Sequence, residues 1–186
     1  MRISKIAPLL LLPMFFPYAV QAQTQNGAKP STSVRDFVQG FYSWYVPQVL
    51  KSRKEPALDL VLKYRAHALS IGLFQALKED SDAQAKVTGE IVGLDFDPFL
   101  NTQDPCESFE VGAVAQKGDS YRVEVYSVCS GKKNEKPAVI AEVVRTGGRW
   151  VFANFHYGNQ IKEYPDSADL MSTLKLLRQE RGGSHK

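Results

Sequence analysis

Residues 109–157 alternate between apolar and polar side chains and are interrupted at glycine-containing turns. A period of two is typical of antiparallel strands with one buried and one solvent-exposed face. The turn Lys117-Gly118-Asp119 predicts a hairpin that joins strands 109–116 and 120–129 through a three-residue loop. This pattern restricts the second half of the chain to an antiparallel sheet.

The hairpin register follows from the length of that loop. It places Val111 opposite Val125 and Ala113 opposite Val123, which puts the apolar residues of both strands on one face.

Two more strands are predicted after the hairpin, at 137–145 and 150–157, joined by Gly147-Gly148. Together the consecutive strands make a meander. On the last strand, alternation places one set of side chains on a common face: Trp150, Phe152, Asn154 and His156.

Residues 33–86 have helical periodicity. Ser33 and Asp36 have the spacing of a capping box and predict a helix that begins at Ser33 and ends or kinks at Pro47. Its segment 41–45 carries aromatic side chains on more than one face of the helix, which indicates that the helix packs under a sheet. A platform that binds a ligand is the alternative.

Further helices are predicted at 58–65, at 71–86 with Ser70 as its cap, and at 166–181. The acidic run 79–82 is interpreted as an exposed stretch. Helices followed by an antiparallel sheet predict an α+β layer architecture with helices on one sheet face.

The N-terminus has the three parts of a secretory signal peptide. Arg2 and Lys5 precede the apolar run 6–16, and small residues lie at 20–22, which predicts cleavage after Ala22. An uncleaved anchor is the alternative, but the run is only about half of the ~20 residues that span a bilayer. We therefore expect a periplasmic or secreted protein without a stable membrane anchor.

The mature chain is predicted to be one domain at 33–181, after a flexible leader at 23–32 and before a disordered tail at 182–186. The whole sequence has 186 residues and a formal charge of +3, which falls to +1 without Arg2 and Lys5. A nearly neutral chain with scattered basic residues gives no indication of a nucleic-acid partner.

An oxidising compartment allows Cys106 and Cys129 to form a disulfide. In the predicted register, position 107 lies opposite Cys129, so Cys106 is one residue away. Two free buried thiols are the alternative.

The motifs of nucleotide, hydrolase and zinc sites are absent, and three histidines offer few metal ligands. No cofactor is predicted. One segment does concentrate oxygen-bearing side chains, which makes it a candidate binding site or a set of turn formers beside proline. Its residues are Asp95, Asp97, Asn101, Gln103 and Asp104.

Proton-transfer catalysis has two candidates, Asp97 and His156, and His67 is the other histidine expected in the ordered domain. Such a role requires burial that tunes the pKa of the group. No catalytic residue is assigned, and no metal site is predicted from these residues.

Three segments carry a family resemblance: 41–45, the Asp97-Pro98-Phe99-Leu100 stretch with Gln103-Asp104, and 150–157. They resemble a family of bacterial exported proteins of unknown function within the nuclear transport factor 2-like, or cystatin-like, superfamily. The resemblance implies a cone-shaped fold: a long first helix across a curved antiparallel sheet, with a cavity between them. That superfamily includes isomerases, dehydratases and pure binding modules, so the fold does not decide the function.

Two functions remain open. The first, which we favour, is a non-catalytic binding or interaction protein for a small ligand or a periplasmic protein, with an immunity-like inhibitor as one version. The second is a small isomerase- or dehydratase-type enzyme. A deep cavity with a buried carboxylate or imidazole at its floor would favour the enzyme, and a cavity filled by Phe41 and Tyr45 would argue against it.

Overall fold

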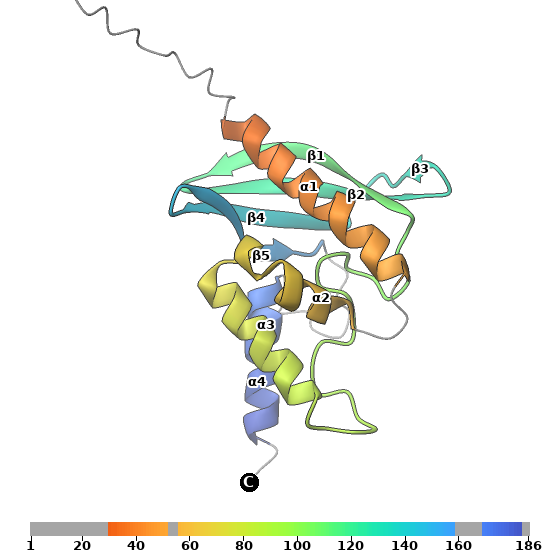
Figure 1. The fold of residues 1–186 in the computed structure, drawn as a ribbon, viewed down its shortest axis with the longest axis vertical. Helices are drawn as coiled ribbons and strands as arrows, with labels where there is room; N and C mark the ends of the chain where they lie inside the picture. Colours follow the sequence, from red (N-terminus) through yellow and green to blue (C-terminus); the bar gives the residue numbers. More distant parts are fainter. Residues whose placement is uncertain (1–29, 52–55, 159–168, 184–186) are drawn as a thin grey trace, which may run out of the picture.

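The computed structural model describes residues 30–51, 56–158 and 169–183, which form four α-helices and an antiparallel five-stranded sheet (Figure 1). The helices are α1 (Pro30–Lys51), α2 (Ala57–Tyr64), α3 (Ile71–Gln84) and α4 (Leu170–Gly183). The strands are β1 (Ser108–Lys117), β2 (Ser120–Cys129), β3 (Lys132–Lys133), β4 (Val139–Thr146) and β5 (Arg149–His156). The sheet order is β1-β2-β4-β5, with β3 paired to β2. The α+β class and the meander are therefore confirmed.

The signal peptide predicted at 1–22 lies outside these residues, as do most of the leader predicted at 23–32, the start of the helix predicted from 166 and the end of the tail predicted at 182–186. No helix in the described ranges combines the length and apolar character of a membrane span.

Helix α1 is longer at both ends than predicted. It begins at Pro30, so Ser33 lies inside it, and the Ser33 hydroxyl accepts a 3.0 Å hydrogen bond from Trp150 Nε1 instead of capping the helix. It also continues through Pro47 to Lys51. Proline removes one backbone hydrogen bond, but side chains on both sides of it, such as Tyr45 and Val49, pack against the core and keep the helix in place.

Aromatic side chains fill the space between α1 and the sheet. The Phe41 ring lies 5.5 Å from that of Phe99 and 4.9 Å from that of Phe152, measured between centroids. Phe155 in turn contacts both, at 5.2 and 5.1 Å. These rings occupy the position at which the family resemblance implies a cavity.

The hairpin register agrees with the prediction at the end away from the turn, where Val111 lies opposite Val125. A bulge follows, and Val114, not Ala113, lies opposite Val123. The predicted pair was wrong because alternation alone does not reveal an inserted residue.

The turn itself holds two residues, not three, because Lys117 pairs directly with Ser120. Gly118 has a φ of 57°, a left-handed conformation that glycine adopts readily. The shorter turn and the one-residue bulge compensate each other, so the register beyond the bulge is the predicted one.

On the last strand, the prediction that Trp150 and Phe152 share a face with Asn154 and His156 is also wrong. A bulge in β5 shifts its register with β4, so Phe152 and Phe155 both lie in the core. Asn154 and His156 therefore point to the opposite face of the sheet.

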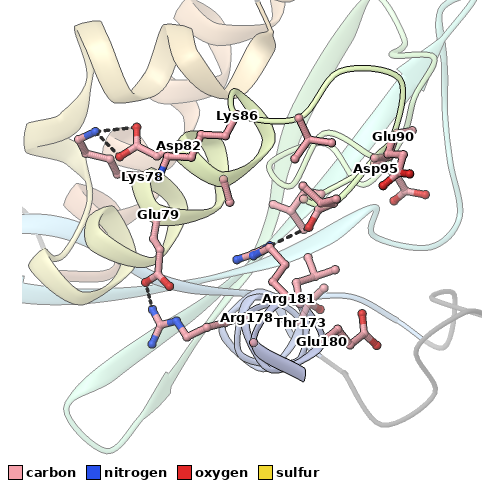
Figure 2. Close-up of a pocket in the computed structure, with 18 of the residues that line it drawn as sticks. Lys78, Glu79, Asp82, Lys86, Glu90, Asp95, Thr173, Arg178, Glu180 and Arg181 are labelled. Carbon is pink, nitrogen blue, oxygen red and sulfur yellow. Dashed lines mark hydrogen bonds and ion pairs between the residues drawn. The ribbon is translucent and has the colours of Figure 1, made fainter. Parts of the chain in front are cut away.

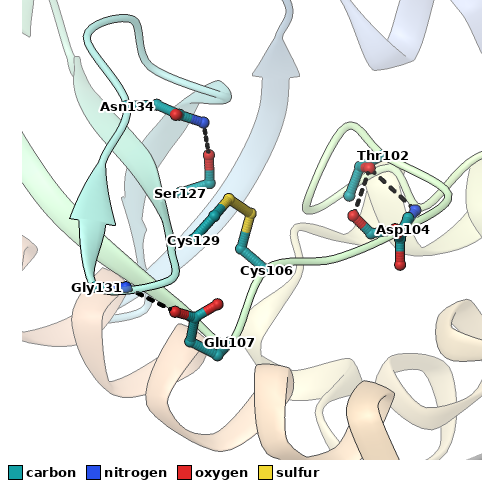
Figure 3. Close-up of a disulfide and its surroundings, with 8 residues drawn as sticks. All are labelled: Thr102, Asp104, Cys106, Glu107, Ser127, Cys129, Gly131 and Asn134. Carbon is teal, nitrogen blue, oxygen red and sulfur yellow. Dashed lines mark hydrogen bonds between the residues drawn. A yellow bond between two sulfur atoms is a disulfide. The ribbon is translucent and has the colours of Figure 1, made fainter.

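The two cysteines are joined in the structure, as predicted. Cys106 and Cys129 form a disulfide with their Cα atoms 4.9 Å apart (Figure 3). Beside it, the Glu107 carboxylate accepts a 2.9 Å hydrogen bond from the Gly131 amide. This pair of links attaches the end of the long loop before β1 to the end of β2.

Side chains of α1 cover the outer edge of β1. The Gln39 amide donates to the Phe109 carbonyl at 3.1 Å and accepts from the Val111 amide at 3.0 Å. Arg35 donates to the carbonyls of Val111 and Gly112. The edge strand therefore has helix side chains as hydrogen-bond partners where another strand would otherwise pair.

Candidate functional site

A loop of more than twenty residues, 85–107, connects α3 to β1 without a helix or ladder strand of its own. Loops longer than about 15 residues are uncommon in small domains and are often functional. The two grooves described below both run along this loop. It is therefore the first place to look for a site.

The Asp97 carboxylate organises the middle of the loop. Its Oδ1 atom accepts hydrogen bonds from the amides of Phe99 and Leu100, at 2.9 and 3.1 Å. Its backbone carbonyl accepts from the amide of Asn101, which has a φ of 54°. This is the turn-forming role that aspartate beside proline favours.

Three tyrosines hold this turn against the core. The hydroxyl of Tyr45 donates to Asp97 Oδ2 at 2.8 Å, that of Tyr42 to the Phe99 carbonyl at 2.8 Å, and that of Tyr157 to the Pro98 carbonyl at 2.9 Å. Burial raises the pKa of all three hydroxyls well above the usual value of 10.0. They remain hydrogen-bond donors at any pH near neutrality.

Asp97 has an altered acidity as a result of this position. Burial raises the pKa of its carboxyl from 3.8 to about 6, against the opposing effect of hydrogen bonds from Tyr45, Phe99 and Leu100. A carboxylate that titrates near neutral pH has the acidity required of a general base.

The other predicted binding residues do not converge with Asp97 on one point. Asn101 Nδ2 donates to the Ala138 carbonyl at 3.1 Å, and Gln103 Nε2 donates to the Asp95 carbonyl at 2.7 Å. The Asp104 backbone bonds the Thr102 hydroxyl, as Figure 3 shows. Among the described residues, no group of three or more His, Cys, Asp or Glu is arranged to hold a metal ion.

A second set of side chains holds the first part of the loop. Gln84 Oε1 accepts from the amides of Val92 and Gly93, at 2.8 and 3.2 Å. Asp80 is 2% exposed and accepts from the Leu94 amide at 2.9 Å and from Arg181 at 2.7 Å.

Asp80 was expected to be exposed, and that prediction was wrong. Its ion pair with Arg181 links α3 to α4. Beside it Glu79 pairs with Arg178 (Figure 2). A signal was available, since Leu73, Leu77 and Asp80 follow helical spacing and share a face.

The larger of the two grooves, here called the α3–α4 groove, has a volume of about 1110 Å³ and lies between α3, α4 and residues 86–96 (Figure 2). Its lining mixes charges of both signs, including Lys78, Asp82 and Arg178. Lys78 pairs with Asp82 at 2.7 Å.

The second groove, here called the Asp97 groove, has a volume of about 530 Å³. Its apolar lining is Val49, Pro56, Ala57, Leu58, Ala85, Ile91, Leu94, Phe96, Pro98 and Pro105. Its polar lining is Asp59, Asp80, Ser81, Gln84, Asp95, Asp97, Thr102 and Gln103. A mostly apolar concave site with a few polar groups is typical of small-molecule binding.

His156 lies apart from both grooves. It is half-buried on the sheet face opposite the aromatic core, with Nε2 2.7 Å from Glu142 Oε2. Neither residue lines the Asp97 groove or the α3–α4 groove. His67 is exposed on the 3₁₀ turn Ala66–Ala68 between α2 and α3.

Comparisons of the chain with protein-family models, curated proteins and solved structures found no match. The Asp97 groove is therefore the candidate site on its geometry alone.

Proposed function

We propose that this chain is an exported, single-domain, non-catalytic binding protein of the nuclear transport factor 2-like, or cystatin-like, type, and that it binds a small ligand in the Asp97 groove. The single observation that carries the proposal is the groove itself, with mostly apolar walls along a long, firmly anchored loop. Its volume of about 530 Å³ lies within the ~300–1,000 Å³ range of small-molecule sites.

The non-catalytic part is supported by how the polar groups of the loop are used. Both Asp97 oxygens accept hydrogen bonds from the protein, and Asn101 and Gln103 bond backbone carbonyls. These contacts stabilise the loop rather than aim reactive groups at one point in the groove.

A matched pair of exposed isoleucines provides the test. Ile91 lines the Asp97 groove where it adjoins the α3–α4 groove, whose lining it shares, and is 71% exposed, whereas Ile71, at the start of α3, is 74% exposed and lies outside both grooves. A neutral apolar dye, Nile red, should fluoresce with the wild-type protein and with Ile71→Asn. With Ile91→Asn the dye affinity should fall about tenfold, because one polar substitution removes apolar contact area. Equal dye binding by the two variants would reject the groove as the site.

A small proton-transfer enzyme is the second candidate, favoured by one observation: Asp97, with a pKa of about 6, lines an apolar groove. A base of this kind would exchange the α-hydrogens of a ketone such as cyclohexenone with deuterium in heavy water, as followed by NMR. Exchange that depends on Asp97 and is lost in Asp97→Asn would favour the enzyme over the binding protein.

Export is a proposal that depends on the signal peptide predicted at residues 1–22. The disulfide is compatible with an oxidising compartment. N-terminal sequencing of the protein purified from its native host should begin near Gln23, and an intact Met1 would contradict export by cleavage.

A further inference from the structure

Among the residues that the structure describes, every charged side chain in the lining of the Asp97 groove is a carboxylate. Four carboxylates belong to its lining, from Asp59, Asp80, Asp95 and Asp97, and no Lys, Arg or His does among the residues that the structure describes. Apolar walls combined with negative charge restrict the ligands that fit, because an anion would meet repulsion in a site of low dielectric.

The four carboxylates differ in their ion pairs, hydrogen bonds and exposure to solvent. Asp80 forms an ion pair with Arg181, Asp59 accepts a 2.8 Å hydrogen bond from Ser81, and Asp95 is exposed to solvent. Asp80 and Asp95 therefore need nothing from a ligand, whereas Asp59, like Asp97, accepts its hydrogen bond from a neutral donor.

Asp97 is distinguished by its burial, which raises the pKa of its carboxyl. Its carboxylate accepts hydrogen bonds from Tyr45, Phe99 and Leu100, and no Lys, Arg or His of the described chain forms an ion pair with it. Its hydrogen bonds come from neutral donors, so among the described residues its negative charge has no counter-ion in this partly buried place. A cation that enters the groove would interact with this charge more strongly than it would in water.

The chemistry of that cation follows from the remaining lining. A metal ion would need several converging oxygen ligands, and the described residues contain no such group. The walls instead offer apolar surface from side chains such as Leu58, Leu94 and Phe96. An organic cation with a hydrocarbon body would satisfy both the carboxylate and the walls.

We infer that the Asp97 groove binds a small apolar ligand that carries one protonated amine, with the ammonium beside Asp97 and the hydrocarbon against the walls. This inference rests on the proposed binding function and specifies its ligand class.

Isothermal titration calorimetry at pH 7.5 with two probes of matched shape tests the inference. The probes are 4-phenylbutylamine, which is a cation, and 4-phenylbutanol, which is neutral. In the wild-type protein the amine should bind at least tenfold more tightly than the alcohol. In Asp97→Asn this ratio should fall below threefold while the affinity for the alcohol stays the same.

Asp119→Asn is the control, since Asp119 is an exposed acid at the β1–β2 turn outside the groove. It should keep the wild-type ratio, which separates a local charge effect from a general loss of negative charge. If Asp97→Asn does not fold, the ratio of amine to alcohol affinity in the wild-type protein still tests the ligand class.

The outcomes separate this inference from the proposed function. Equal affinities for amine and alcohol, with both probes displacing Nile red, would overturn the amine inference and leave the binding function in place. Failure of both probes and of Nile red to bind would overturn both. A ratio that falls equally in Asp119→Asn would also reject the role of Asp97.

Discussion

The hydroxyl of Tyr45 on α1 donates a 2.8 Å hydrogen bond to Asp97 Oδ2 in the loop, across 52 positions of sequence. It joins the helix that covers the sheet to a residue that lines the candidate site. Both the stability of the loop and the acidity of Asp97 depend on it.

The stability of the protein should depend on the protonation of Asp97. Its pKa is about 6 in the folded protein against an ordinary value of 3.8, so the folded state holds the proton more tightly. The resulting stabilisation is fully present below about pH 4 and is lost as pH rises through about 6. The difference of about two units corresponds to roughly 3 kcal/mol.

Asp97→Asn removes that titration. Urea denaturation between pH 4 and pH 7.5 should show the wild-type free energy of unfolding falling relative to the variant by up to about 3 kcal/mol. Asp169, whose pKa is lowered, acts in the opposite direction in both proteins, so only the difference between them reports on Asp97. Parallel pH profiles would contradict the assignment.

Tyr45→Phe should lower the free energy of unfolding by about 1–2 kcal/mol, because it deletes a hydrogen bond to a partly buried acceptor and keeps the ring. It should also raise the pKa of Asp97 further, since the Tyr45 hydroxyl stabilises the ionised carboxyl. A double-mutant cycle with Asp97→Asn measures the coupling, and additive effects would show that the hydrogen bond contributes nothing.

Loss of the disulfide should lower the free energy of unfolding by about 3 kcal/mol, from the entropy of a loop of this length in the unfolded chain. The double variant Cys106→Ser, Cys129→Ser and the reduced wild type should unfold at similar urea concentrations. Reductant should have no effect on the variant. A wild type that is equally stable with and without reductant would be at odds with this role.

Gly93→Ala should destabilise the protein by about 1–3 kcal/mol. A Cβ atom at this position would lie 2.8 Å from Asp80 Oδ2, and Asp80 is fixed by Arg181 and the Leu94 amide. Gly158→Ala is the matched control, since nothing lies within 4 Å of its added Cβ. Equal melting temperatures of the two variants would show that Asp80 shifts at no cost.

The strands and most helices could be predicted because their signals are local. Alternation located the four long strands, and Ser70 caps α3 as expected, accepting from the Leu73 amide at 3.2 Å. The bulges were not predictable in this way. In β5 the bulge brings both Phe152 and Phe155 into the aromatic core, where Phe152 contacts Phe41 of α1, and the local pattern of the strand does not encode that contact.

The candidate site was predictable only in part. Asp97 beside Pro98 was expected either to form a turn or to bind, and the turn is observed. Its partner Tyr45 and the Asp80–Arg181 pair come from elements distant in sequence, whose contacts depend on the complete fold. No short motif encodes such contacts, so the groove that they shape could not be inferred from the sequence.

The side chains of Gln39 and Arg35 on the edge of β1 have a consequence for the behaviour of the protein in solution. An open sheet edge invites a second molecule to add its own strand, the first step toward sheet-mediated aggregation. Here the Phe109 and Val111 carbonyls already have donors within the same chain. Side chains of helix α1 therefore occupy hydrogen-bonding groups at the edge of β1 and disfavour self-association through this strand at high protein concentration.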